Sequence, residues 1–151
     1  MRKATRILLS HRPQSNLVSV IPVDLNGAKL NYCYQNAFAL ANSNQNDMCV
    51  VSGWLVGEFW NEHGTAIIPH YWVYNEKSKK YLDPTPKNPN DFQMYEYVID
   101  IDIFRYARKN TTLPFPMRIL EDGKVQVRQA NGIFIDISKV DVEELYSMCE
   151  A

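Results

Sequence analysis

The segment AIIPHYWVYNEKSKKYLDPTP, residues 66–86, decides the fold because it predicts two β-strands joined by a tight turn. Its first part, residues 66–75, is rich in β-branched and aromatic residues, and the polar stretch EKSK has the composition of a turn. The stretch KYLDPTP is a short returning strand. Pro84 and Pro86 end that strand, because proline cannot donate to a neighbouring strand.

The register of this predicted hairpin determines whether His70 meets Asp83. A loop of residues 75–78 places His70 directly opposite Asp83. A loop of residues 76–79 places Asp83 opposite Trp72, with His70 on the same face along the diagonal. A three- or five-residue loop would send the two side chains to different faces. The sequence therefore permits an imidazole–carboxylate contact and does not require one.

A helix with a cysteine in its first turn is predicted upstream, over NYCYQNAFALAN, residues 31–42, with Asn31 as N-cap. Its apolar face is expected to consist of Ala37, Phe38, Leu40 and Ala41. At a helix N-terminus, unpaired N–H groups and the dipole lower the pKa of a thiol and stabilise an oxyanion. This position distinguishes Cys33 from Cys49 and Cys149, which we expect to be buried core residues.

The remaining segments predict an α+β fold with a mostly antiparallel sheet. Residues 1–14 are expected to form a solvated basic arm or a first strand, and residues 57–64 a loop beside the strands. Other predicted strands are residues 16–23, ending near Pro22, and residues 48–60. Residues 95–110 predict a strand and then a helix from about residue 101, capped by Asp100.

The C-terminal third predicts a three-stranded antiparallel meander over residues 117–137, because two hairpin signals interrupt its alternating pattern. These signals are Asp122-Gly123 and Asn131-Gly132. Ser138, followed three residues later by Asp141, resembles a capping box and predicts a terminal helix that carries Cys149.

Composition favours one domain over the 151 residues and excludes several classes of protein. The net charge of -1 provides no global basic field for nucleic acid, and the basic cluster RYARKN, residues 105–110, is better explained as a solvated helix end. We expect no membrane span and no export signal. Three widely spaced cysteines favour reduced thiols and a cytoplasmic location. The oligomeric state is not predicted.

No cofactor is expected, and a metal site is not favoured. Cys33, His63, His70 and Asp83 are possible ligands, but their spacing matches no compact zinc motif. A nucleophilic cysteine, in contrast, needs a base and a group that orients the base. His70 and Asp83 follow Cys33 in that order.

This order resembles the transglutaminase-like branch of the papain-like superfamily of cysteine hydrolases. HYWVYN, residues 70–75, is similar to the His-x-Trp-Val stretch of that family, and YLDPTP, residues 81–86, is similar to its Asp-Pro-Thr stretch. NYCYQNAFAL is similar to the helix that begins at the nucleophile. The family commonly shows Trp beside the cysteine, where this chain has Tyr. The resemblance covers roughly residues 30–86.

The resemblance implies a Cys-His-Asp triad. Cys33 would be the nucleophile that forms a thioester, His70 the base, and Asp83 the group that holds the imidazole tautomer. The oxyanion donors would be the Cys33 N–H and one further group from Asn31, Gln35 or Asn36. The expected substrate-binding residues are Tyr32, Gln35, Trp54 and Trp72.

The resemblance also implies a papain/transglutaminase-like core over residues 1–151, with a nucleophile helix packed on the sheet and a C-terminal helix. The expected activity is a cysteine-dependent amide hydrolase or acyl transferase (peptidase, deamidase or transglutaminase type) that acts on a protein or peptide. The alternative is a non-catalytic binding or modulator protein that retains the fold.

Overall fold

The computed structural model describes residues 1–43, 47–57, 64–87, 95–107, 116–129 and 131–145. Its helices are α1 (Lys3–His11), α2 (Cys33–Ser43) and α3 (Ile101–Ala107), and none of these described helices combines the length and apolar character needed to cross a bilayer. The strands are β1 (Asn16–Val18), β2 (Val20–Pro22), β3 (Met48–Gly57), β4 (Thr65–Asn75), β5 (Lys80–Asp83), β6 (Glu96–Ile99), β7 (Met117–Ile119), β8 (Val125–Arg128) and β9 (Phe134–Ile137).

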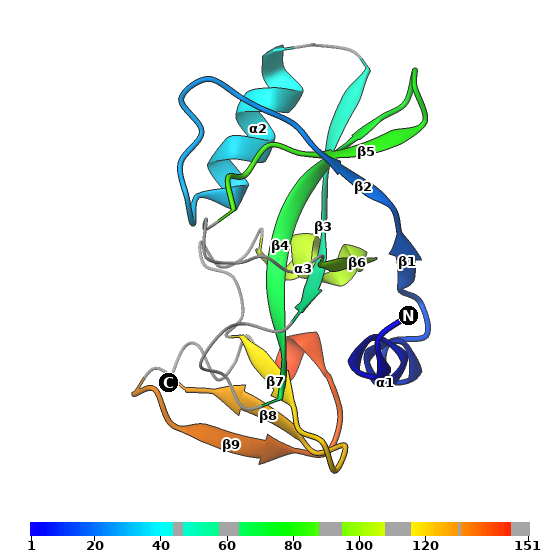
Figure 1. Ribbon diagram of the computed structural model, residues 1–151, viewed down its shortest axis with the longest axis vertical. Helices are drawn as coiled ribbons and strands as arrows, with labels where there is room; N and C mark the ends of the chain where they lie inside the picture. Colours follow the sequence, from blue (N-terminus) through cyan, green and yellow to red (C-terminus); the bar gives the residue numbers. More distant parts are fainter. Residues whose placement is uncertain (44–46, 58–63, 88–94, 108–115, 130, 146–151) are drawn as a thin grey trace.

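The strands form one sheet in the order β1-β6-β3-β4-β7-β8-β9, and β5 joins β4 near its far end (Figure 1). The long antiparallel pair β3–β4 is its centre, with residues 48–57 opposite residues 66–75. Among the described strands only β2 and β5 pair in parallel. The predicted α+β class with a mostly antiparallel sheet is therefore confirmed, as are the strand–helix order after residue 95 and the C-terminal meander.

Alternation along the central strands divides the buried side chains between the two faces of the sheet. On one face, Tyr71 and Val73 pack against Ala37 and Ala41 of α2. The largest core cluster continues from Trp54 of β3 to α1, α3 and the meander. On the other face, Trp72 packs with Leu55 and Tyr97. Figure 1 shows α2 beside the β4–β5 end of the sheet, with the meander at the opposite end.

The N-terminal segment is a helix, so the prediction of a solvated arm or strand was wrong. Ala4 and Leu8 lie one turn apart on α1 and are buried in the main core, with exposed fractions of 4% and 0%. This i, i+4 spacing of apolar residues is the pattern of an amphipathic helix. The predicted strand over residues 16–23 is divided into β1 and β2, because each half pairs with a different strand.

Two predicted helix caps are displaced. Asn31 adopts a left-handed backbone (φ 66°) and precedes the cap, because the Tyr32 carbonyl accepts the first helical hydrogen bond of α2, from the Asn36 N–H. In the C-terminal segment Asp141, and not Ser138, caps a helical turn at residues 142–145 by accepting from two backbone N–H groups. Asp100 caps α3 as predicted, accepting from the Asp102 N–H at 3.1 Å.

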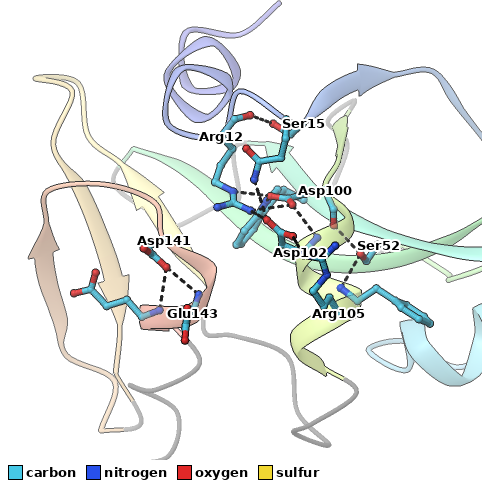
Figure 2. A network of polar contacts seen from close by, with 12 residues as sticks. Arg12, Ser15, Ser52, Asp100, Asp102, Arg105, Asp141 and Glu143 are labelled. Carbon is cyan, nitrogen blue, oxygen red and sulfur yellow. Dashed lines mark hydrogen bonds and ion pairs between the residues drawn. The ribbon is translucent and has the colours of Figure 1, made fainter.

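A buried ion pair joins the N-terminal helix to the centre of the sheet (Figure 2). Arg12 Nε lies 2.9 Å from Asp100 Oδ2, and the Asp100 side chain is completely buried. Trp54 Nε1 donates to the same carboxylate at 3.0 Å. The Ser52 hydroxyl donates to the Asp100 carbonyl and accepts from the Phe104 N–H, which fixes the start of α3 against β3.

Candidate active site

The hairpin register brings His70 and Asp83 together. Asn75 pairs with Lys80 around a loop of residues 76–79, which is one of the two registers that the sequence permits. His70 Nε2 lies 2.9 Å from Asp83 Oδ2, and both residues are buried. Since Nε2 is engaged by the carboxylate, the other ring nitrogen, Nδ1, is left to interact with the cysteine thiol.

Cys33 reaches His70 at a gap in the sheet edge. On the side away from β3, β4 pairs with β5 at residues 73–75 and with β7 at residues 65–67. Within the described chain, residues 68–72 have no strand partner on that side. The N-terminus of α2 lies at this gap, where Cys33 packs against the core cluster that contains Tyr71 and Val73 and interacts electrostatically with His70. Cys33, which packs on the Tyr71 face of the sheet, thus lies near His70, which belongs to the Trp72 face.

The electrostatics of the three groups favour an ion pair between thiolate and imidazolium. Burial raises the pKa of the Cys33 thiol, but the hydrogen bond and charge of His70 and the Tyr71 N–H outweigh it, so this pKa is lowered. Burial lowers the pKa of His70, but the hydrogen bonds and charges of Asp83 and Cys33 reverse this effect and raise it. Each group therefore stabilises the charged form of its neighbour.

Asp83 is a fully satisfied carboxylate. Its Oδ2 atom contacts His70, Lys87 Nζ at 2.8 Å and Tyr97 Oη at 2.6 Å, while Oδ1 accepts from the Thr85 N–H at 3.0 Å. Burial raises the pKa of this carboxyl, but His70 and Lys87 outweigh burial and hold the pKa well below its usual range. Asp83 is therefore ionised at neutral pH and can orient the imidazole.

Asn36 fixes the loop that leads into α2. Its side-chain amide accepts from the Lys29 N–H at 3.1 Å and donates to the Lys29 carbonyl at 2.8 Å. It also donates to Thr85 Oγ1 at 3.2 Å, next to the Asp83 segment. The buried amide thus ties the approach to Cys33 to the strand end that carries the aspartate. This structural role occupies Asn36, which was one of the candidate oxyanion donors.

The four predicted substrate-binding residues fall into two pairs. Tyr32, directly before α2, and Gln35, on α2, are exposed and line a cavity of about 350 Å³ with the loop at residues 25–29. Trp54 and Trp72 have exposed fractions of 0%, so the expectation that they line a cleft was wrong. Both belong to the long central hairpin, where the sheet is covered on its two faces and large aromatic side chains fill the core.

Cys49 is exposed near the start of β3, so the prediction that it is a core residue was wrong. Burial and the nearby charge of Glu76 raise its pKa, opposite to the shift at Cys33. Cys149, His63 and residues 58–63 of the predicted loop lie outside the described residues. In the part of the chain that the structure describes, no three His, Cys, Asp or Glu side chains are arranged to hold a metal ion.

Sequence reasoning did not find Gly53, Lys87 and Tyr97, which surround the triad. Lys87 is four residues from Asp83, but the intervening prolines gave no reason to expect a helical i, i+4 pair. Tyr97 comes from β6, and its approach to Asp83 depends on long-range strand order. A single sequence carries no local signal for either contact.

Comparison with models of protein families, with curated proteins and with solved structures finds no significant match to this chain.

Proposed function

We propose that the protein is a cysteine-dependent amide hydrolase or acyl transferase of the transglutaminase-like, papain-like type, acting on a protein or peptide. The observation that carries the proposal is the grouping of three residues: His70 Nε2 lies 2.9 Å from Asp83 Oδ2, and His70 interacts electrostatically with Cys33. Nucleophile, base and orienting carboxylate stand in the order that thiol acyl transfer requires. A free thiol nucleophile functions in a reducing compartment, so we also propose a cytoplasmic location.

The proposed reaction begins with attack of the Cys33 thiolate on the substrate carbonyl carbon. The carbonyl electrons move to oxygen, and the oxyanion is stabilised by the unpaired N–H groups of the first turn of α2. The His70 imidazolium then donates its proton to the leaving amine as the carbon–nitrogen bond breaks, which gives a thioester. Water or a second amine attacks the thioester, His70 takes its proton, and the thiolate is restored.

Tyr32 and Gln35 are the proposed substrate contacts. Both line the cavity, Tyr32 directly before Cys33 in the chain and Gln35 two residues after it. Lys29 lies over the Tyr32 ring, with Nζ 5.8 Å from the ring centroid. Substitutions of Tyr32 or Gln35 by Ala should therefore raise KM more than they lower kcat.

The experiment that tests the proposal is acylation by p-nitrophenyl acetate, an activated ester that needs no specific recognition. Thiolate attack releases p-nitrophenolate and leaves one acetyl group on sulfur. Intact-mass analysis after a short reaction near pH 6.5 should show one acetyl group on wild type and none on Cys33→Ala. Cys49→Ala is the matched control and should acylate like wild type, because the pKa of Cys49 is raised.

Hydrolysis and acyl transfer are distinguished by adding a primary amine. Faster loss of the acetyl group with added amine, and recovery of the acetylated amine, would identify acyl transfer, whereas an unchanged rate would identify hydrolysis. Equal acylation of wild type and Cys33→Ala, or acetylation located only at Cys49, would refute the proposed function and leave a non-catalytic binding role.

A further inference from the structure

A second group of side chains lies behind the triad, on the side of Asp83 away from Cys33. Three donors converge on one carboxylate oxygen, Asp83 Oδ2: His70 Nε2 at 2.9 Å, Lys87 Nζ at 2.8 Å and Tyr97 Oη at 2.6 Å. Lys87 follows the end of β5, and Tyr97 comes from β6. These contacts exceed what is needed to orient an imidazole, because His70 alone needs only one acceptor.

Tyr97 is held rigidly at this oxygen. It is 7% exposed, and its ring packs edge-on against Trp72, with ring centroids 5.3 Å apart, and against His70 at 6.2 Å. Burial and the charge of Asp83 raise the pKa of the Tyr97 phenol, so it stays protonated and always donates. Tyr97 therefore fixes the carboxylate in position without changing its net charge.

Lys87 adds a charge at the same place. Its ammonium lies 5.3 Å and 5.5 Å from the ring centroids of Tyr95 and Tyr97, which holds the flexible side chain over two aromatic faces. Because Lys87 Nζ and His70 Nε2 both contact Oδ2, the two nitrogens are at most 5.7 Å apart (2.8 Å plus 2.9 Å). At this separation a lysine cation opposes a proton on the imidazole.

This opposition has a chemical use. An imidazole beside an unshared, buried carboxylate holds its proton strongly, which favours the thiolate but hinders proton donation to the leaving amine. A cation bound to the same carboxylate weakens the attraction between the carboxylate and the imidazole proton. The groups that face His70 from the elements packed around it are Cys33, Asp83, Lys87 and Tyr97. Their combined effect makes His70 a base of intermediate strength.

We propose that Lys87 and Tyr97 are positioning residues: Tyr97 fixes the Asp83 carboxylate, and Lys87 limits its charge so that His70 can return its proton to the leaving group. The inference deepens the proposed function and rests on it, since it assigns His70 the role of acid and base. Neither residue touches the reacting atoms.

The test is an NMR titration of the His70 ring carbons in a Cys33→Ala background, where the imidazole titrates without the thiolate. Lys87→Met should raise the pKa of His70 by about one unit, a figure reduced for the partial exposure of Lys87. Lys87→Gln keeps a donor to Asp83 without the charge and should give the same increase. Lys87→Arg keeps the charge and should leave the titration within about 0.3 units of the parent.

Tyr97→Phe separates position from charge. It should broaden or split the His70 resonances, because the carboxylate loses its rigid neutral donor, and raise the pKa of His70 by less than Lys87→Met does. An unchanged His70 titration in folded Lys87→Met and Lys87→Gln proteins would overturn the inference. The titration needs no substrate, so a protein that shows these shifts but is not acylated at Cys33 would refute the proposed function alone.

Discussion

Gly53 lies directly opposite His70 in the β3–β4 register, and its missing side chain leaves the space that the Trp72 ring occupies. A Cβ atom at Gly53 would lie 2.5 Å from Trp72 Cη2 and 2.0 Å from the Val98 carbonyl oxygen. His70 therefore lies opposite a position where the β6 backbone and the Trp72 ring leave no room for a side chain.

Gly53→Ala should destabilise the protein by about 3 kcal/mol, because the neighbouring contact is backbone and cannot move aside cheaply. It should also slow alkylation of Cys33 by displacing His70. Urea unfolding and thiol alkylation measure the two effects. Gly123→Ala is the control: a Cβ there meets no atom within 4 Å, so only its left-handed backbone (φ 87°) costs about 1 kcal/mol. Equal losses in both variants would contradict the packing role of Gly53.

Asp83 should contribute stability that is lost in acid. Its folded-state pKa lies below the value of about 3.9 expected in an unfolded chain. As the pH falls below about 5, the unfolded chain binds this proton first, so the free energy of unfolding decreases until the folded carboxyl is also protonated. Above this range the contribution is complete.

Asp83→Asn should therefore lower the free energy of unfolding at pH 7 by about 3 kcal/mol and flatten its decline below pH 5. The measurement is urea unfolding at a series of pH values. Asp136→Asn removes an exposed carboxylate on β9 and serves as the control. Acid declines of the same steepness in wild type and Asp83→Asn would show that this carboxyl is not the acid-sensitive group.

Arg12→Met should lower the free energy of unfolding by about 3–5 kcal/mol, because it leaves the fully buried Asp100 carboxylate without its cation. The matched control is Arg105→Met, since the Arg105 side chain is 66% exposed and lies 3.6 Å from Asp102. That exposed pair is worth at most about 0.5 kcal/mol. Denaturant midpoints measured with both variants compare the two losses of stability. A loss in Arg12→Met as small as that in Arg105→Met would mean that the Arg12–Asp100 pair contributes little.

Asn36→Ala should lower the free energy of unfolding by about 2 kcal/mol. It removes three hydrogen bonds and leaves the Lys29 N–H and carbonyl without their side-chain partner. It should also reduce the alkylation rate of Cys33 near pH 6, since the approach to α2 is no longer fixed. Gln35→Ala, one residue away and exposed, should leave stability unchanged. Wild-type reactivity of Cys33 in the Asn36→Ala protein would show that Asn36 does not position the thiol.

Local patterns predicted the strands and turns near the site, because their signals lie within a few residues. The β4–β5 hairpin and Gly123 with its positive φ follow from alternation and turn chemistry. The choice between two hairpin registers could not be made from sequence, since both four-residue loops keep His70 and Asp83 on one face. Pairing of β5 with both β4 and β2 accompanies the register that is found.

The errors arose where tertiary contacts determine the outcome. The apolar residues Ala4 and Leu8 stand among basic residues, so the sequence of α1 predicts a solvated arm, although both side chains are in the core. The sequence predicts Trp54 and Trp72 as substrate contacts, but both side chains are completely buried in the core. Tyr97 meets Asp83 only because β6 joins the sheet beside β3, which no local pattern reveals.

The most direct test of the central claim is the iodoacetamide alkylation rate of each cysteine as a function of pH, in wild type and His70→Ala. Lys87 and Tyr97 still contact Asp83 when His70 is removed, so the variant is expected to fold. We predict that Cys33 of wild type reacts rapidly below pH 7 and that His70→Ala moves its pH profile upward, while Cys49 reacts only at higher pH in both proteins. A wild-type Cys33 that titrates like a free thiol, near about 8.5, or a profile unchanged by His70→Ala, would contradict the thiolate–imidazolium pair.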